Sequence, residues 1–258
     1  GSEMCIRDRV KTIKSNDKGL IDFSDFKDNI DENFAGVMIT NPNTCGLFET
    51  DIVKISELAH KSGGYLYCDG ANFNAVVGKL KPGDLGIDAM HINLHKTFST
   101  PHGGGGPGSG PVVFSNRLEK FCPTPLVKNI KGDLILVEDS NEKDLTKSFG
   151  RLNVFHGQMG MFVRAMSYML SHGADGLKQV SEDAVLNANY LRASLSSHLT
   201  PAFDGFCMHE ILFSDDFLKD TGVETLDFAK AMIDEGYHPM TIYFPCLLYT
   251  SPSPRDIG

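Results

Sequence analysis

The chain has no tryptophan, no closely spaced pair of cysteines and no long apolar segment. Its six cysteines occur singly, which argues against a disulfide framework and suits a reducing compartment. No segment approaches the roughly 18 consecutive apolar residues that indicate a membrane span. A net charge of −9 and a pI near 5.4 argue against nucleic acid or an anionic membrane as a partner.

Several common ligand-binding motifs are also missing. Neither the G-x-x-x-x-G-K-[ST] pattern nor a helix-opening G-x-G-x-x-G is present, so neither phosphate-cradling motif is predicted. His91, His95 and His102 lie close together in the sequence, but their spacing fits neither H-E-x-x-H nor a Cys/His zinc site. We therefore predict no metal. The run Gly103–Gly106, taken alone, is equally consistent with a flexible loop and with the wall of a cofactor site.

The 258 residues, 41% of them hydrophobic, suffice for one large domain or for one domain and part of another. Gly36–Thr40 is a continuous apolar run typical of a buried parallel strand. A helix over Thr50–Ser62 follows, and then strands over Gly64–Cys68 and Ala89–Leu94. This alternation predicts right-handed βαβ units and a mainly parallel sheet with flanking helices, in the α/β class.

Patterns on either side of this region predict further elements. Within Val10–Phe34 the pattern predicts a strand, a turn and a short helix with Ser24 as its N-cap. Helices over Phe155–His172 and Ala174–Leu199 are separated by Gly173, and the first carries a face of Met161, Val163, Met166 and Met169 that we interpret as core. The remaining predicted elements are strands at Pro111–Ser115, Leu134–Val137 and His209–Phe213 and helices at Asn116–Phe121 and Thr225–Glu235.

An acid and an amine are expected at the carboxyl ends of two neighbouring strands. Asp69 follows Gly64–Cys68, and Lys96 follows Ala89–Leu94. Ligands of open α/β sheets bind outside these strand ends. A pyridoxal phosphate site needs a lysine for the Schiff base and usually an acid for the pyridine nitrogen. Taken alone, such a lysine is usually a surface residue and such an aspartate usually a turn residue, so the prediction of a site depends on the pair.

Neighbouring residues fit the same site. The small Ala71 would let a flat ring lie close to the backbone, and Asn93 and His95 could donate hydrogen bonds to a phosphate or to the cofactor's oxygen. His95 and His102 are both candidates for phosphate or carboxylate contacts, and spacing does not decide between them. Thr44, in the turn after Gly36–Thr40, is our candidate for a further polar contact, with turn formation as the equally open alternative.

Three segments resemble the glycine cleavage system P-protein, a pyridoxal-phosphate-dependent glycine decarboxylase. They are TNPNTCGLFE (Thr40–Glu49), DGANFNA (Asp69–Ala75) and INLHKTFSTPHGGGGPGSGP (Ile92–Pro111). The resemblance extends over 10–245 and is closest to the catalytic, C-terminal-type subunit of the two-subunit form. It implies pyridoxal phosphate fold type I, with Lys96 as the Schiff-base lysine, Asp69 as the partner of the pyridine nitrogen and Ala71 packed against the ring.

The resemblance also implies a reaction and partners. The reaction is decarboxylation of glycine, with transfer of the aminomethyl group to the lipoyl arm of H-protein. The partners are a companion subunit or a second copy of the chain, in a dimer or heterotetramer. The expected location is the bacterial cytoplasm, or the mitochondrial matrix if the source is eukaryotic. Two other functions stay open: another fold type I enzyme, such as an amino-acid decarboxylase, aminotransferase or desulfurase, and a non-catalytic scaffold subunit.

Both chain ends are expected to be foreign. The segment MCIRD (Met4–Asp8) can be encoded by ATGTGTATAAGAGACA, whose reverse complement encodes CLLYT (Cys246–Thr250). This is typical of an adapter read through at both ends of a DNA fragment. We divide the chain into foreign ends at 1–9 and 246–258, a partial cofactor-binding large domain at 10–200 and the start of a small α+β C-terminal domain at 201–245. Part of the family's cofactor site lies upstream of Val10, so this chain is expected to bind pyridoxal phosphate poorly while its full-length parent is active.

Overall fold

The computed structural model describes residues 9–102, 108–138, 147–148, 150–152, 154–238 and 241–242. The two ends predicted to be foreign lie outside this part apart from Arg9, as does the glycine run 103–106. The helices are α1 (Phe23–Asp28), α2 (Ile52–Lys61), α3 (Leu94–Thr97), α4 (Met159–Leu195) and α5 (Thr225–Asp234). The strands are β1 (Gly36–Thr40), β2 (Tyr65–Gly70), β3 (Ala89–Ile92), β4 (Val112–Phe114), β5 (Leu126–Ile130), β6 (Asp133–Val137), β7 (Thr200–Pro201) and β8 (Phe213–Ser214).

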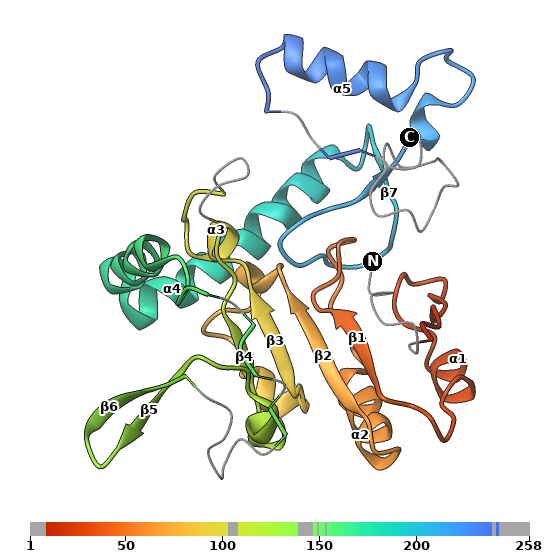
Figure 1. Cartoon of the computed structure of the whole chain (residues 1–258). Helices are drawn as coiled ribbons and strands as arrows, with labels where there is room; N and C mark the ends of the chain where they lie inside the picture. The colour runs from red at the N-terminus through yellow and green to blue at the C-terminus, as the bar shows by residue number, and fades with distance from the viewer. Residues whose placement is uncertain are drawn as a thin grey trace.

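A four-stranded sheet in the order β1-β2-β3-β4 forms the centre of the molecule (Figure 1). β1, β2 and β3 run parallel, and β4 pairs with β3 in the antiparallel direction. An antiparallel edge strand on an otherwise parallel sheet is common in α/β proteins. The predicted α/β class and its mainly parallel sheet are therefore confirmed. The carboxyl ends of the three parallel strands lie together at one edge of the sheet, where we predicted the site.

One face of the sheet is buried under α2. Ile39, Leu66, Cys68 and Met90 point from three adjacent strands into one cluster, together with Ile52 of α2. These positions alternate with residues on the opposite face because successive side chains of a strand point to opposite sides. The alternation places Asp69 on the face opposite Cys68. Burial of Cys68 raises the pKa of its thiol to about 11, so this cysteine is a protonated packing residue at neutral pH.

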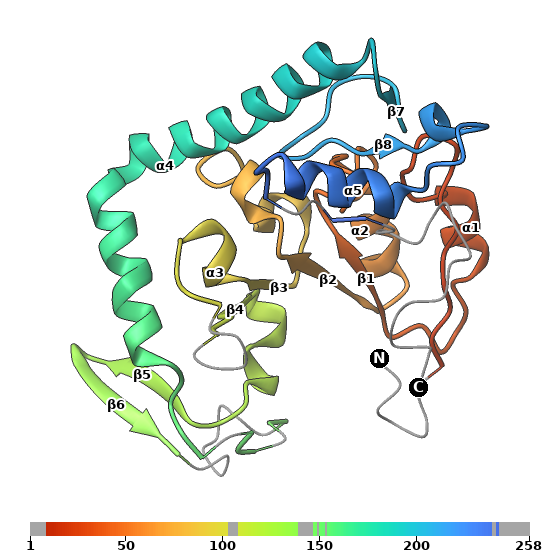
Figure 2. The ribbon, with the colours of Figure 1, turned by 90° about the horizontal axis from the view of Figure 1, so that it is seen from above.

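A long bent helix packs beside the site segments. α4 changes direction at Gly173, whose φ of 64° and ψ of −176° are not helical, and Figure 2 shows the two arms meeting at an angle. The predicted helix end at Gly173 is thus confirmed. Ala165 of the first arm packs with Leu94 and Phe98. In the second arm, the Ser181 hydroxyl donates to the carbonyl of Val77 at 2.8 Å.

Several predicted details are wrong. Asp22 caps α1, since its carboxylate accepts from the backbone N–H groups of Ser24 and Asp25, so Ser24 is not the cap. Of the predicted strand His209–Phe213, only Phe213 lies in a strand, the two-residue β8.

The predicted methionine face of α4 is also only partly core. Met161 is buried, whereas Val163 and Met166 are 52% and 53% exposed. The apolar spacing identifies one side of a helix, but it does not establish that another element covers that side. The proposed division at residues 200 and 201 stays a prediction.

Candidate active site

Asp69 lies at the carboxyl edge of the sheet, in the middle of three parallel strands. It pairs in register with Thr40 of β1 and with His91 of β3. The strand was predicted to end at Cys68, but β2 continues to Gly70 and includes Asp69. Its carboxylate Oδ1 accepts a hydrogen bond from the backbone N–H of Ala71 at 2.8 Å and lies 3.0 Å from Nε2 of His91. Two groups, the Ala71 N–H and the His91 imidazole, therefore hold the Asp69 carboxylate through one of its oxygens.

Lys96 lies in the single turn of α3, just beyond β3. The predicted strand Ala89–Leu94 is too long, because β3 ends at Ile92 and Leu94 begins α3. Asn93 is the N-cap, and its backbone carbonyl accepts from the Lys96 N–H at 3.1 Å. The Lys96 side chain is exposed, and within the described part of the chain its ammonium has no hydrogen-bond or ion-pair partner. The amine is thus available to bind a ligand.

The loop after β1 is fastened to the turn that follows Asp69. The buried side chain of Asn72 donates to the carbonyl of Pro42 at 2.9 Å. Asn43 holds the loop in shape, since its side-chain oxygen accepts from the N–H groups of Cys45 and Leu47. Thr44 is half-buried in this loop. The structure therefore brings the loop carrying Thr44 next to the residues that follow Asp69.

His95 and His102 contact each other. Their ring centroids are 4.3 Å apart, with the rings nearly perpendicular. Burial, together with the nearby charges of His102 and Lys96, lowers the pKa of His95 below its usual range. His95 is therefore neutral at pH 7, and its imidazole has one N–H to donate and one nitrogen to accept. Its role as a phosphate or carboxylate contact stays a prediction, as does that of His102.

Polar groups without partners are concentrated around α3. Nδ1 of His95 and the hydroxyls of Thr97 and Thr100 are buried, and none of the three has a hydrogen-bond partner within the described residues. Buried polar atoms are normally satisfied by protein or water, so each one in such a cluster needs an explanation. A polar ligand beside α3 would provide one. The Lys96 amine could react with an electrophilic centre of such a ligand, and the Asp69 carboxylate could pair with a protonated basic centre.

Sequence reasoning missed Tyr67 and treated His91 only as a possible metal ligand. The Tyr67 hydroxyl lies 2.8 Å from Nδ1 of His91, whose other nitrogen faces Asp69. Burial is the main reason that the pKa of Tyr67 is raised, and the negative charge of Asp69 adds to it. The period of two along β2 places Tyr67 and Asp69 on one face, but only the pairing of β2 with β3 brings His91 between them.

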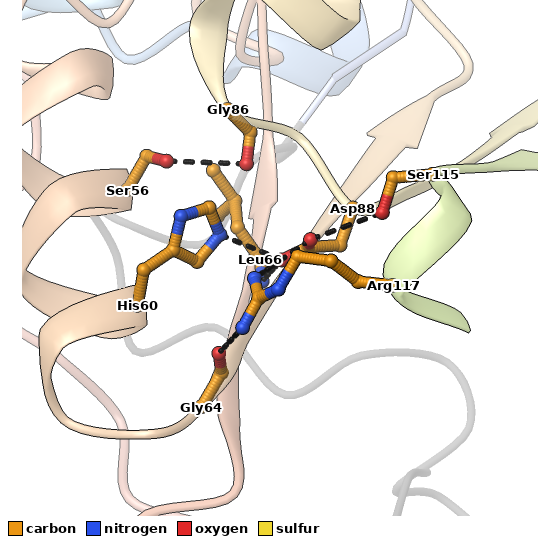
Figure 3. Close-up of polar contacts among 8 residues, drawn as sticks. All are labelled: Ser56, His60, Gly64, Leu66, Gly86, Asp88, Ser115 and Arg117. Atoms are coloured by element: carbon orange, nitrogen blue, oxygen red, sulfur yellow. Dashed lines mark hydrogen bonds and ion pairs between the residues drawn. The ribbon is translucent and has the colours of Figure 1, made fainter.

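A second polar cluster, at the opposite end of β3, was also missed. Asp88 is buried and accepts hydrogen bonds from the N–H of Leu66, from Ser115 and from Arg117 (Figure 3). Nε2 of His60 lies 2.8 Å from the same carboxylate. Burial alone would raise the pKa of Asp88, but the hydrogen bonds from Leu66, His60 and Arg117 outweigh burial and lower it. This cluster ties α2, β2, β3 and the segment after β4 together, and we interpret it as structural.

Among the residues that the structure describes, no three His, Cys, Asp or Glu side chains are grouped so that they could hold a metal ion. No helix there combines the length and the hydrophobicity that crossing a membrane requires.

Two family descriptions match the chain. Residues 4–120 match "Aminotransferase class-V", and residues 180–250 match "Glycine dehydrogenase, C-terminal domain". A curated protein of Caulobacter vibrioides, "Probable glycine dehydrogenase (decarboxylating) subunit 2", is 60% identical over 241 residues, which are 93% of this chain and 46% of that protein. The protein of the same name from Kosmotoga olearia is 52% identical over 93% of this chain and 49% of its own length.

A solved structure gives an independent comparison. "Crystal structure of glycine decarboxylase (P-protein) of the glycine cleavage system, in inhibitor-bound form" matches with a TM-score of 0.63 and 21% identity, over 80% of this chain and 47% of that one. At this identity the likeness concerns the fold, and with the class-V match it confirms the predicted fold type I architecture. The chain spans about half the length of the curated relatives it matches.

Proposed function

Because the chain belongs to the family of glycine dehydrogenase (decarboxylating) subunit 2, we propose that it is the part of a P-protein that carries the reactive lysine. The full-length protein would decarboxylate glycine and pass the aminomethyl group to a lipoyl arm. The observation that carries this proposal is the placement of Asp69 and Lys96. Asp69 lies at the carboxyl end of β2, one residue before Gly70, and Lys96 follows the end of the parallel neighbour β3.

The cofactor we propose is pyridoxal 5'-phosphate. When bound, it supplies an electron sink that stabilises negative charge developing on the substrate carbon. The residues present fit this group, because the chain offers a free amine for its aldehyde, a carboxylate for its ring nitrogen and unsatisfied polar groups beside α3. No metal is needed in this proposal.

Each site residue has a separate role in the proposal. Lys96 would hold the cofactor through its side-chain nitrogen, and the same amine would donate and accept protons at the substrate. Asp69 keeps a proton on the ring nitrogen by providing a negative charge beside it. Ala71 leaves room for the flat ring. Asn93, His95, Thr44 and His102 are the proposed polar contacts to the remaining cofactor and substrate oxygens.

The proposed partners follow from the same family. The relatives' names contain "subunit 2", so a companion subunit is the proposed permanent partner, in a dimer or heterotetramer. The transient partner is lipoylated H-protein. The relatives named above are bacterial, and we propose the bacterial cytoplasm as the location, where isolated cysteines such as those of this chain stay reduced.

The test uses the full-length parent assembled with its companion subunit and loaded with pyridoxal phosphate. Lys96→Ala is expected to abolish the visible absorption band of the lysine-bound cofactor. It is also expected to abolish exchange of labelled carbon dioxide into the carboxyl group of glycine, because no amine is left to hold the cofactor. Lys61→Ala, at the exposed end of α2, is the matched control and should keep both. A wild-type assembly without the band would refute the proposal.

The same assay separates the alternative reactions. Exchange that lipoylated H-protein stimulates is specific to the glycine reaction, whereas an aminotransferase or desulfurase would show the band without that exchange. A non-catalytic scaffold would show neither. Activity with another amino acid but not with glycine would support the first alternative.

A further inference from the structure

Three side chains on one face of the sheet form a continuous polar chain that leads to Asp69. The Tyr67 hydroxyl lies 2.8 Å from Nδ1 of His91, and Nε2 of His91 lies 3.0 Å from Oδ1 of Asp69. Tyr67 and Asp69 are two residues apart on β2, and His91 occupies the position of β3 that pairs with Asp69. The parallel pairing of β2 and β3 therefore brings these three side chains together, without a contribution from any loop.

The positions of the hydrogen atoms in the Tyr67–His91–Asp69 series follow from the groups at its two ends, a carboxylate and a hydroxyl. An ionised carboxylate only accepts hydrogen bonds, so Nε2 of His91 must carry the hydrogen that points at Asp69. A neutral imidazole then has Nδ1 as an acceptor, and the Tyr67 hydroxyl donates to it. The raised pKa of Tyr67, caused first by burial and then by Asp69, keeps this hydroxyl protonated at neutral pH and able to donate.

The two oxygens of Asp69 are used unequally. Oδ1 accepts from the N–H of Ala71 at 2.8 Å and faces His91 at 3.0 Å. Oδ2 has no partner among the residues that the structure describes. Two donors on one oxygen fix the plane of the carboxylate and leave the other oxygen as the acceptor for a ligand.

We propose that Tyr67 and His91 are positioning residues that hold the Asp69 carboxylate in its orientation, so that it keeps the proton of the cofactor on the ring nitrogen. This inference rests on the proposed function, because the proposed function places Asp69 beside the ring nitrogen of the cofactor. Tyr67 fixes the tautomer of His91, and His91 fixes Asp69. Neither residue is expected to touch the substrate. Loss of His91 should therefore lower kcat more than it changes KM for glycine.

The first experiment needs no cofactor. Nitrogen NMR of the imidazole of His91, in the full-length parent before loading, is expected to show a protonated Nε2 and an unprotonated, hydrogen-bonded Nδ1 at neutral pH. Tyr67→Phe should produce a mixture of tautomers, whereas Tyr190→Phe, at a tyrosine that is 69% exposed, should not. An imidazole with Nδ1 protonated in the wild type, or one that Tyr67→Phe leaves unchanged, would overturn the inference.

The second experiment observes the cofactor. The loaded assembly carries pyridoxal phosphate labelled with nitrogen-15 in the ring, and its chemical shift reports whether that nitrogen is protonated. His91→Leu should shift the signal toward the unprotonated form and lower kcat by about 10-fold or more, the size of effect seen when the partner behind a ligating group is removed. His91→Gln keeps an N–H that can reach Asp69, so it should restore most of the protonated signal. His198→Gln, at an exposed histidine, is the control.

The two experiments fail in distinguishable ways. If the wild-type assembly binds no cofactor at Lys96, the proposed function is refuted, while the tautomer of His91 is still measured. If the cofactor binds and the nitrogen signal stays the same in both His91→Leu and His91→Gln, the proposed function stands and the positioning role is wrong. Should His91→Leu fail to fold, Tyr67→Phe carries the test through the tautomer of His91. A His91 tautomer that Tyr67→Phe leaves unchanged would overturn the inference.

Discussion

Asp88→Ala is expected to remove the strongest polar anchor of the sheet. The Asp88 side chain is 2% exposed, and its carboxylate accepts from the fully buried N–H of Leu66 at 2.9 Å. It also accepts from Arg117 at 2.8 and 2.9 Å, and Nε2 of His60 lies 2.8 Å away. Truncation removes all of these contacts at once and leaves the N–H of Leu66 buried without an acceptor.

The size of the loss can be worked out from these contacts. Removing one partner of a buried ion pair costs about 3–5 kcal/mol, and a buried donor without an acceptor costs about 1–3 kcal/mol. The Arg117 side chain is 41% exposed, so water can solvate its charge and the lower end applies. We expect Asp88→Ala to lower the free energy of unfolding by about 3 kcal/mol. Asp88→Asn keeps an oxygen for Leu66 and should cost about 1–2 kcal/mol.

The assay is urea unfolding of this chain followed by circular dichroism, at several pH values. The control is Asp31→Asn, which removes an exposed ion pair with Lys11 and should leave the midpoint unchanged. If Asp88→Ala does not fold, Asp88→Asn provides the measurement. A midpoint for Asp88→Ala equal to that of the wild type would refute the anchoring role.

The contribution of Asp88 to the free energy of unfolding is expected to fall at acidic pH. The pKa of Asp88 is lower in the folded chain than in the unfolded chain, where an aspartate titrates near ~3.9. Its contribution to stability is therefore complete above about pH 5 and is lost as the pH falls through the folded-state pKa. The difference in stability between the wild type and Asp88→Asn should shrink only on acidification below about pH 4. A difference that stayed constant down to pH 2 would contradict this assignment.

The remaining predictions concern the packing around the site and use the same unfolding assay. Gly46 has a φ of +76°, and a Cβ there would lie 2.0 Å from the carbonyl oxygen of Glu210, so Gly46→Ala should cost roughly 2–3 kcal/mol by overpacking and strain. The same substitution at Gly83, where a Cβ meets nothing within 4 Å, should cost far less, and equal effects would contradict the argument. Ser181→Ala removes the 2.8 Å hydrogen bond to Val77 and should cost about 1 kcal/mol; an unchanged midpoint would show that α4 is not anchored there.

The local pattern of the chain was sufficient to predict most elements of the sheet. β1 matches its predicted bounds at Gly36–Thr40, because the length of an apolar run between turn residues favours a strand. Its predicted burial is wrong, since β1 is an outer strand of the described sheet and only Ile39 in it is buried. Gly173 interrupts α4 as predicted, because a glycine can adopt a backbone conformation that ends a helix.

Other features depended on contacts between distant parts of the chain. β5 was not predicted as a strand, since its pattern is weak and it is defined by pairing with β6. The exposed side chains of Val163 and Met166 show the same limit, because a helical period gives the direction of a face and not its neighbour.

The sequence by itself determined the α/β class, the family resemblance and the two residues on which the proposed chemistry depends, Asp69 and Lys96. These follow from local composition and from motifs that are continuous in the chain. Only the tertiary structure decided what surrounds Asp69. Tyr67, His91 and Asp69 form one polar chain because β2 and β3 pair in a particular register, and register is set by the packing of whole strands and not by the residues that it brings together.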